Sequence, residues 1–378
     1  MFHSYFFPIS YAFMMFPIAA LIFTLPFLIV QYRRHGYIHK LRALILYLLL
    51  LYLMNAYFLV LLPMPSSRHN MAPSGSMMQL APLQFIQDII DGSKIIPDQI
   101  STYWSLLREP AFLQVIFNIA LTVPFGLFLG YYFRTRWGMC ILLSFILSLS
   151  FEVTQVTGIY GFFDHPYRLF DVDDLITNTL GGIFGFRIAI WINGLLPQIE
   201  QLDSNIDRSA KRVSYTRRGI AFFIDSMVWI IGFGLLYGFD VKSAFWIVTG
   251  MYFILIPAFT GGRTLGKWIV RIRVTNRGNR ASFWALMIRY GLLYWVILGL
   301  HAIVIDSDVT GLLSSPLRTV AYLIVLLVDL VFFIHLIIKV FKKDDQLIYE
   351  KLSRTSHVIS WPEKRLHTDA SNSSSLED

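Results

Sequence analysis

The chain of 378 residues is too apolar for a water-soluble globular protein, because 56% of its residues are hydrophobic and only 15% are charged, against about 25% charged in soluble domains. Its net charge of +8 does not indicate nucleic-acid binding, since the 32 Lys and Arg lie in short clusters between apolar runs rather than on one basic face. The single cysteine excludes an internal disulfide and a cysteine-based metal site. The long apolar runs instead predict an all-α, polytopic bundle of membrane-spanning helices.

Nine apolar stretches of about 17 to 25 residues are long enough to cross a bilayer. The first is predicted to be a retained span, because no basic segment precedes it and no small-residue cleavage site follows. The seventh is short, and the fifth contains Gly181, Gly182 and Gly185. The predicted spans are residues 11–30, 41–62, 112–133, 139–157, 175–191, 219–239, 245–260, 283–305 and 317–338.

Basic residues concentrate in every second connection, as nine alternating spans require. The positive-inside rule therefore predicts an amino terminus outside the cell and a tail, after Lys339, in the cytoplasm. The other connections, including residues 63–110, are near neutral or acidic and are predicted to face outward. The basic connections hold Arg33, Arg34, Lys40 and Arg42; Arg134 and Arg136; Arg208, Lys211, Arg212, Arg217 and Arg218; and Arg263, Lys267, Arg271, Arg273, Arg277 and Arg280.

A polar linker over residues 197–215 divides the predicted spans into two groups. Five spans belong to a first membrane domain, residues 1–196, and four to a second, residues 216–360. The linker is predicted to be cytoplasmic. Residues 361–378 are small, polar and acidic and are predicted to be disordered.

Polar side chains at matching depth in three predicted spans form a first candidate site at the outer membrane face, because polar groups inside a span are costly and informative. Glu152 and Gln155 are three residues apart and share a helix face in the outer third of their span. Asp171 and Asp174 begin the next span on one face. The candidate site comprises Asn118, Glu152, Gln155, Asp171, Asp174 and Asn178, with Arg168 just above the layer.

This outer polar layer has two interpretations. In the first, the side chains only cap and join helices, with Asp171 and Asp174 at a helix start and Glu152 paired with Arg168. In the second, which the number of acids and amides favours, the layer is a ligand site open to the outer leaflet. The prediction is that the layer holds no metal and no cofactor. His165 is the single nearby histidine, which argues against zinc. A site for a hard cation, with only the oxygens of Glu152, Asp171 and Asp174 as ligands, is the alternative.

Three segments carry a resemblance to a known family: NIALTVPFGLFLG, SFEVTQ and RLFDVDDLITNTLGGIFG. Over about residues 10–195 the chain resembles the VanZ-like membrane domain. The resemblance implies a bacterial cell-envelope protein linked to reduced susceptibility to glycopeptide antibiotics, notably those with a lipid tail such as teicoplanin. The matching residues are Asn118, Pro124, Gly126, Glu152, Gln155, Arg168, Asp171, Asp174, Asn178, Gly181 and Gly182.

A second candidate cluster lies at inner membrane depth and consists of Arg218, Asp225, Arg289 and Asp329. Asp225 follows Arg218 by two helical turns and lies about 10 Å deeper, at a depth similar to that of Arg289. An isolated charge at this depth costs several kcal/mol, so these groups are predicted to pair, Asp225 with Arg289 in particular. The cluster is either a structural ion-pair network or a cation or proton path.

The second half resembles the RDD domain over about residues 210–360, on the segments RRGIAFFID, GRTLGKWIVRIRVTNRGNRASFWALMIRY and YEKLSRTSHV. The family motif maps to Arg218 and Asp225, and its Thr-x-Gly-Lys loop maps to Thr264, Gly266 and Lys267. Asp329 and Glu350 are the two candidates for the second acid of the motif. The resemblance implies a membrane domain for which transport is one suggestion. Residues 263–280 alternate cations with apolar side chains, which predicts a short strand or ribbon against anionic headgroups.

Three functions follow from these patterns. The leading hypothesis is a bacterial plasma-membrane protein, non-enzymatic or weakly enzymatic, that binds a lipid-linked peptidoglycan precursor or a glycopeptide antibiotic at the outer leaflet. The first alternative is a secondary transporter, cation or proton coupled, that uses the inner charges. The second is an outer-leaflet enzyme with Glu152 as acid or base. This alternative is disfavoured because no histidine is placed to activate Ser148. Membrane lipids are the other expected partners, and the sequence leaves the oligomeric state open.

Overall fold

A computed structural model describes residues 2–62, 64–72, 75–92, 100–199, 212–276, 278–305, 314–342 and 346–360. Within these residues, eight helices are long and apolar enough to cross a membrane, and the apolar segment Ala244–Thr260 is shorter. The predicted all-α, polytopic membrane fold is therefore confirmed, while the orientation of the termini stays a prediction. The predicted tail and residues 200–211 of the predicted linker lie outside the described residues.

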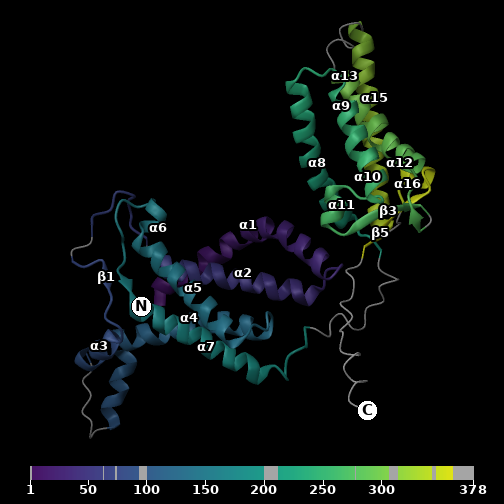
Figure 1. Ribbon diagram of the computed structural model, residues 1–378. Helices are drawn as coiled ribbons and strands as arrows, with labels where there is room; N and C mark the ends of the chain where they lie inside the picture. The colour runs from purple at the N-terminus through teal and green to yellow at the C-terminus, as the bar shows by residue number, and fades with distance from the viewer. Residues whose placement is uncertain are drawn as a thin grey trace, which may run out of the picture. The chain divides into compact units, whose positions relative to one another are not determined.

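Two compact units make up the chain (Figure 1). The first comprises Met1–Phe23 and His39–Asn205, and the second comprises Thr24–Ile38 and Ile206–Asp378. The division crosses the first helix, α1 (Phe2–Arg34). The Arg217 guanidinium lies 4.5 Å from the centre of the Tyr32 ring, so the last turns of α1 pack in the second unit. The sequence predicts a first domain over residues 1–196 and gives no sign of this exchange.

Helices α2 (Lys40–Leu61), α4 (Pro110–Tyr131), α5 (Trp137–Val156) and α7 (Val172–Ile192) form the bundle of the first unit. Short elements lie at one end of this bundle, the end that the prediction places outside. A two-residue strand, β1 (Met78–Gln79), pairs in parallel with β2 (Phe170–Asp171). The other short elements are α3 (Gln84–Gly92), the 3-10 helix η1 (Ile100–Arg108) and α6 (Gly158–Gly161).

Glycines on α7 lie where its backbone nearly touches the neighbouring helices. A Cβ atom added to Gly181 would meet the Ile119 carbonyl of α4, and one added to Gly185 would also meet the α4 backbone. On α4, a Cβ atom on Gly126 would meet the carbonyl of Gly182. Small residues allow membrane helices to approach this closely. Helix α7 therefore runs unbroken through its glycines, which hold it against α4 and fix the relative positions of their polar side chains.

The second unit combines long helices with a small sheet. Figure 1 shows the strands and the short helices α11 and α16 gathered at one end of the long helices. The helical elements are α8 (Tyr215–Gly238), α9 (Ala244–Thr249), the π-helix η3 (Gly250–Leu255), α10 (Ile256–Thr260), α11 (Leu265–Ile269), α12 (Phe283–Tyr290), the π-helix η4 (Gly291–Leu298), α13 (Gly299–Ile305), α15 (Ser315–Lys342) and α16 (Ile348–Leu352).

The predicted short strand in residues 263–280 is β3 (Ile272–Asn276). It lies between β4 (Asn279–Arg280) and β5 (Thr355–Ile359), and both pairings are antiparallel. Ile272 and Val274 point inward and are buried, whereas Arg273 between them is exposed, as the two-residue period of a strand requires. Pairing with β5 brings the C-terminal segment back to the last turn of α12, where Arg289 lies, and this contact builds the inner charge cluster.

Candidate functional site

The junction between β2 and α7 positions the acids of the outer polar layer. Asp171 caps α7, because its Oδ1 accepts a hydrogen bond of 2.8 Å from the backbone N–H of Asp173. The backbone N–H of Asp171 donates to Glu152 Oε2 on α5, at 3.0 Å. Glu152 is only 2% exposed. One hydrogen bond from a backbone N–H therefore joins the Glu152 carboxylate of α5 to the start of α7.

Asp174 lies against α4 and is bound by side-chain amides. Asn118 Nδ2 donates to Asp174 Oδ1 at 2.6 Å, and Gln114 Nε2 donates to the same oxygen at 3.1 Å. The structure thus brings together Asn118 and Asp174, which the sequence analysis placed in one layer. Gln114 was missed, although it lies one helical turn before Asn118 on the same face.

The remaining predicted members of the layer have different roles. Gln155 Nε2 donates to the Val60 carbonyl at the end of α2, at 2.8 Å, so it joins two helices. The Asn178 carbonyl accepts a hydrogen bond of 2.6 Å from the Thr122 hydroxyl of α4, while the side-chain Oδ1 of Asn178 is buried without a hydrogen-bond partner. Arg168 is exposed and, among the described residues, forms no ion pair with Glu152, so the pair that the purely structural interpretation of the layer invoked is absent.

Asp173 is a structural residue that the sequence analysis missed. Its Oδ1 accepts from the backbone N–H of Leu83 at 2.6 Å, and its Oδ2 accepts from Phe85 at 2.9 Å. These two bonds tie the first turn of α3 to the start of α7. No local pattern in the sequence indicates this role, because both partners lie about ninety residues earlier in the chain.

The outer polar layer concentrates negative charge. In the part of the first unit that the structure describes, none of Glu152, Asp171 and Asp174 forms an ion pair; their hydrogen bonds come from backbone N–H groups and amides. Burial, together with the negative charge of Asp173, raises the pKa of the Asp171 carboxyl. Such a layer favours a ligand that brings positive charge and hydrogen-bond donors.

Two other chemistries fit this layer less well. The residues that the structure describes contain no group of three or more His, Cys, Asp or Glu side chains arranged to hold a metal ion. Ser148, the hydroxyl nearest to Glu152 in the sequence, is fully buried and donates to the Asp174 carbonyl at 3.2 Å. Its hydroxyl is therefore committed to joining α5 and α7 and is not presented as a nucleophile.

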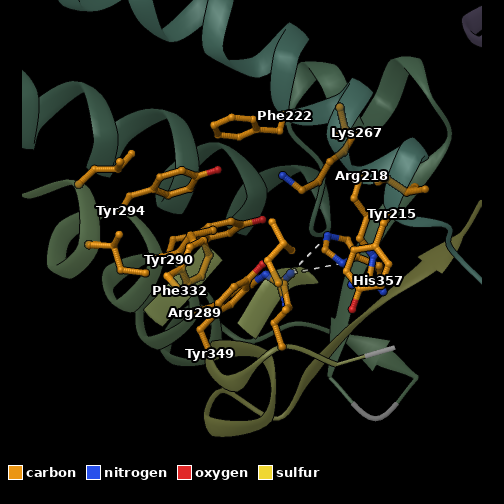
Figure 2. A pocket seen from close by; sticks show the side chains of 18 of the residues that line it. Tyr215, Arg218, Phe222, Lys267, Arg289, Tyr290, Tyr294, Phe332, Tyr349 and His357 are labelled. Atoms are coloured by element: carbon orange, nitrogen blue, oxygen red, sulfur yellow. Dashed lines mark hydrogen bonds between the residues drawn. The ribbon is translucent and has the colours of Figure 1, made fainter. Parts of the chain in front are cut away.

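The inner charge cluster is centred on Glu350 of α16, and Figure 2 labels its partners Arg218, Arg289 and His357. Glu350 is fully buried, and its Oε1 lies 2.6 Å from Arg289 Nη2 and 3.0 Å from His357 Nδ1. Its Oε2 accepts from Arg218 at 3.2 Å and from the backbone N–H of Leu347 at 3.0 Å. Arg289 therefore pairs with Glu350, and the predicted direct pair between Asp225 and Arg289 is wrong.

Electrostatics keeps this cluster charged at Glu350 and neutral at His357. Burial alone would raise the pKa of the Glu350 carboxyl, but the hydrogen bond from His357 and the charges of Arg289 and Arg218 hold it well below its usual value. Burial and the neighbouring Arg289 lower the pKa of His357 to about 3. At neutral pH His357 is therefore uncharged and acts as a hydrogen-bond donor to Glu350.

Asp225 has its own set of partners near the start of α11. Its two oxygens accept from the Thr264 hydroxyl at 2.6 Å, the backbone N–H of Gly266 at 2.7 Å and the Tyr252 hydroxyl at 2.7 Å. Lys267 Nζ lies 3.5 Å from Asp225 Oδ2. A Cβ atom on Gly266 would clash with the backbone of α8 and with the Asp225 carboxylate, so only glycine permits this approach.

Two further residues complete the description of the inner charges. Arg217 was not predicted as a site residue, yet it is 1% exposed and donates to three carbonyls, those of Val270, Gly36 and Arg271. Asp329 of α15, which was predicted to join the cluster, instead pairs with His301 at 2.9 Å, and its side chain is 43% exposed.

Comparison with protein families assigns each unit. Residues 46–193 match the VanZ/LLP1 family model, and residues 212–354 match the RDD family model. The chain is a VanZ-like domain fused to an RDD-family domain. Neither a search of curated proteins nor a search of solved structures gave a match.

The fusion confirms both resemblances, in the predicted order, and identifies a multi-pass membrane protein of the cell envelope. In the RDD-family domain, the Thr-x-Gly-Lys loop surrounds Asp225 on α8. Of the two candidates for the second acid, Glu350 contacts Arg218 and Arg289, whereas Asp329 contacts neither. In the VanZ-like domain, the polar motif residues line the junction of α4, α5 and α7.

Proposed function

We propose that this protein lies in a bacterial plasma membrane and lowers susceptibility to glycopeptide antibiotics such as teicoplanin. In this proposal the outer polar layer faces outward and binds a positively charged group of a lipid-linked cell-wall component or of the antibiotic itself. The observation that carries the proposal is the excess of carboxylates at the junction of α4, α5 and α7, where Glu152, Asp171 and Asp174 form no ion pair.

A purely structural layer would not need this excess. Amide and hydroxyl groups such as those of Gln155 and Thr122 already join the helices, and buried carboxylates without a cationic partner are costly. A ligand ammonium group would remove that cost by supplying the missing charge and its donors. Lipid-linked cell-wall precursors and lipid-tailed glycopeptides such as teicoplanin combine amines with an apolar chain, so they fit a charged site at the membrane surface.

The first test is a growth-inhibition assay in a susceptible bacterial host that expresses the full chain. Glu152→Gln keeps the size of the side chain and an oxygen that accepts from Asp171, but it removes the charge, so we expect loss of protection against teicoplanin at unchanged protein level. Asp164→Asn is the matched control, because Asp164 is an exposed acid of the same domain that pairs with His69. Equal protection by wild type and Glu152→Gln would refute the proposal.

A binding assay on purified full-length protein separates the two ligand classes. Teicoplanin and a lipid-linked peptidoglycan precursor are compared with the same molecules after acetylation of their amines. We expect one of the two to bind, and acetylation to weaken its binding at least tenfold. Binding that is indifferent to acetylation would mean that the carboxylates do not recognise the amine.

The inner charge cluster supports a structural role in this proposal rather than transport. Glu350 accepts hydrogen bonds from three side chains and one backbone N–H. A carboxylate that must bind and release a proton or cation needs a state in which these partners separate. We therefore assign Glu350 and Arg289 to holding the C-terminal segment against α12.

A further inference from the structure

A cavity of about 340 Å³ lies within the RDD-family domain. Its walls are apolar side chains of α8, η4 and α15, among them Phe222, Leu293 and Phe332, and its floor carries Arg218, Lys267 and Arg289 (Figure 2). This volume lies within the range of small-ligand sites, about 300 to 1,000 Å³. The cavity thus combines an apolar length with one cationic end.

The charges around the floor do not cancel. Three cations, Arg218, Lys267 and Arg289, line the cavity, and no carboxylate lines it. The two carboxylates behind the floor are Glu350 and Asp225, so the three cations leave one positive charge in excess. Glu350 binds both arginines, so the charge in excess is most available at Lys267, whose Nζ is 3.5 Å from Asp225.

Asp225 is already satisfied by shorter hydrogen bonds from other groups. The Thr264 and Tyr252 hydroxyls and the Gly266 N–H donate to it at 2.6 to 2.7 Å. The second contact of Lys267 Nζ is to the Thr264 hydroxyl, at 3.2 Å. An ammonium group carries three donors, so Lys267 retains capacity for an anion in the cavity.

A buried hydroxyl points to the same place. Tyr290 is 2% exposed, and its hydroxyl has no hydrogen-bond partner. Figure 2 shows this hydroxyl and the Lys267 nitrogen directed into the same space, and Lys267 Nζ lies 5.3 Å from the centre of the Tyr290 ring. Buried hydroxyls are rarely left without a partner in native proteins, so a ligand oxygen at this position would satisfy both groups.

The wall opposite α8 has an unusual backbone. Residues Gly291–Leu298 form a π-helix of eight residues directly after Tyr290, and they contribute Leu293, Tyr294 and Ile297 to the cavity. π-Helical turns are rare, and they occur frequently at functional sites because they displace side chains from the regular helical positions. Here the π-helical segment and Tyr290, which directly precedes it, line the same cavity.

We propose that this cavity binds an anionic lipid through one apolar chain, with the negatively charged head held by Lys267 and the Tyr290 hydroxyl. The apolar walls exclude a fully hydrated ion, and the cationic floor selects an anionic head over a neutral or cationic one. The occupant is therefore an amphiphile of fatty-acid or single-chain phospholipid type. This site is separate from the outer polar layer, and its existence does not depend on the function proposed for that layer.

The test measures binding of tritiated oleate to the full-length protein in phosphatidylcholine nanodiscs, with empty nanodiscs as background. We expect saturable binding of one oleate per chain. Leu293→Trp fills the cavity without touching a charge and should weaken binding at least tenfold. Ile231→Trp is the matched control, because Ile231 is 64% exposed on α8 and lies outside the cavity lining; it should bind as wild type does.

The headgroup is tested by Tyr290→Phe and by competition. Tyr290→Phe removes only the unpartnered hydroxyl, so the protein should fold, bind oleate about tenfold more weakly and bind oleyl alcohol nearly unchanged. Unlabelled oleate should compete, whereas oleylamine and inorganic phosphate should not. If oleylamine competed as well as oleate, the claim that the site selects an anionic head would be wrong. If inorganic phosphate competed and unlabelled oleate did not, the claim that the ligand is a lipid would be wrong. Wild-type binding by Leu293→Trp would overturn the location.

Discussion

The two domains of this protein bury their carboxylates in opposite ways. In the RDD-family domain, Glu350 is enclosed by Arg289, Arg218 and His357, so its charge is neutralised within the fold. In the VanZ-like domain, Glu152 and Asp174 accept hydrogen bonds from a backbone N–H and from amides, with no cation in contact. Both arrangements hydrogen-bond their carboxylates, but only in the first do cations contact the carboxylate.

This difference separates a structural cluster from a binding site. A closed ion-pair network stabilises one arrangement, because its central carboxylate already has cationic partners within the fold. A layer whose carboxylates accept hydrogen bonds but contact no cation is stable enough to fold and still attracts a cation. Removal of one charge should therefore damage folding in the RDD-family domain and ligand recognition in the VanZ-like domain.

The largest expected effect is on folding, from Glu350→Gln. The variant leaves Arg289, which is 1% exposed, without its carboxylate, and breaking a buried pair costs about 3 to 5 kcal/mol. Thermal unfolding in detergent should show a large loss of stability and of folded yield. The control is Asp329→Asn, because Asp329 is half-exposed beside His301, and its loss should stay within about 1 kcal/mol. Equal losses from the two variants would contradict a closed cluster at Glu350.

The close contact of α4 and α7 gives the next largest effect. Gly126→Ala places a methyl group against the backbone of Gly182, so the helices must separate, at a cost of about 1 to 3 kcal/mol. The same separation should weaken the hydrogen bond between Asn118 and Asp174. Gly138→Ala is the matched control, since no atom lies within 4 Å of its added Cβ. If both variants unfold at the same temperature, the glycine contact does not set the helix spacing.

How far the sequence predicts these sites depends on the element that carries each residue. Helix rise and period placed Asn118, Glu152 and Asp174 in one layer, because both quantities are nearly constant in a membrane-spanning helix. Glu350 and His357 follow the last span, and their position depends on the pairing of β3 with β5. The short polar sequence of β5 does not predict this pairing. Asp173 bonds to residues about ninety positions away, so no local pattern indicates its role.

Acid should weaken the RDD-family domain through His357. Its pKa in the folded protein, about 3, lies below the usual 6.5, so its contribution to stability is complete above pH 6.5 and is lost as the pH falls from 6.5 toward 3. Between pH 7 and pH 5 the loss should be about 2 kcal/mol. The lowered pKa of Glu350 acts in the same direction at lower pH. His357→Gln should flatten the pH dependence of the unfolding temperature above pH 5. An unchanged slope would mean that another titrating group causes this pH dependence.

The smallest effect is the coupling between Asp225 and Arg289, which have separate partners. In a double-mutant cycle, Asp225→Asn and Arg289→Gln should be additive within about 0.5 kcal/mol. Arg289→Gln and Glu350→Gln form the positive control and should show strong coupling, because their side chains are 2.6 Å apart. Strong coupling in the first cycle would restore the direct pair that the structure excludes.

The most direct measurement compares one charge removal in each domain, with teicoplanin protection divided by the amount of folded protein in the membrane. Asp174→Asn keeps an oxygen that accepts from Asn118 and should retain near-normal folded protein while losing most protection per folded molecule. Glu350→Gln should lose folded protein while the molecules that remain protect normally. The opposite pattern, with Asp174→Asn unfolded and Glu350→Gln folded but unprotective, would contradict the assignment of recognition to the outer polar layer.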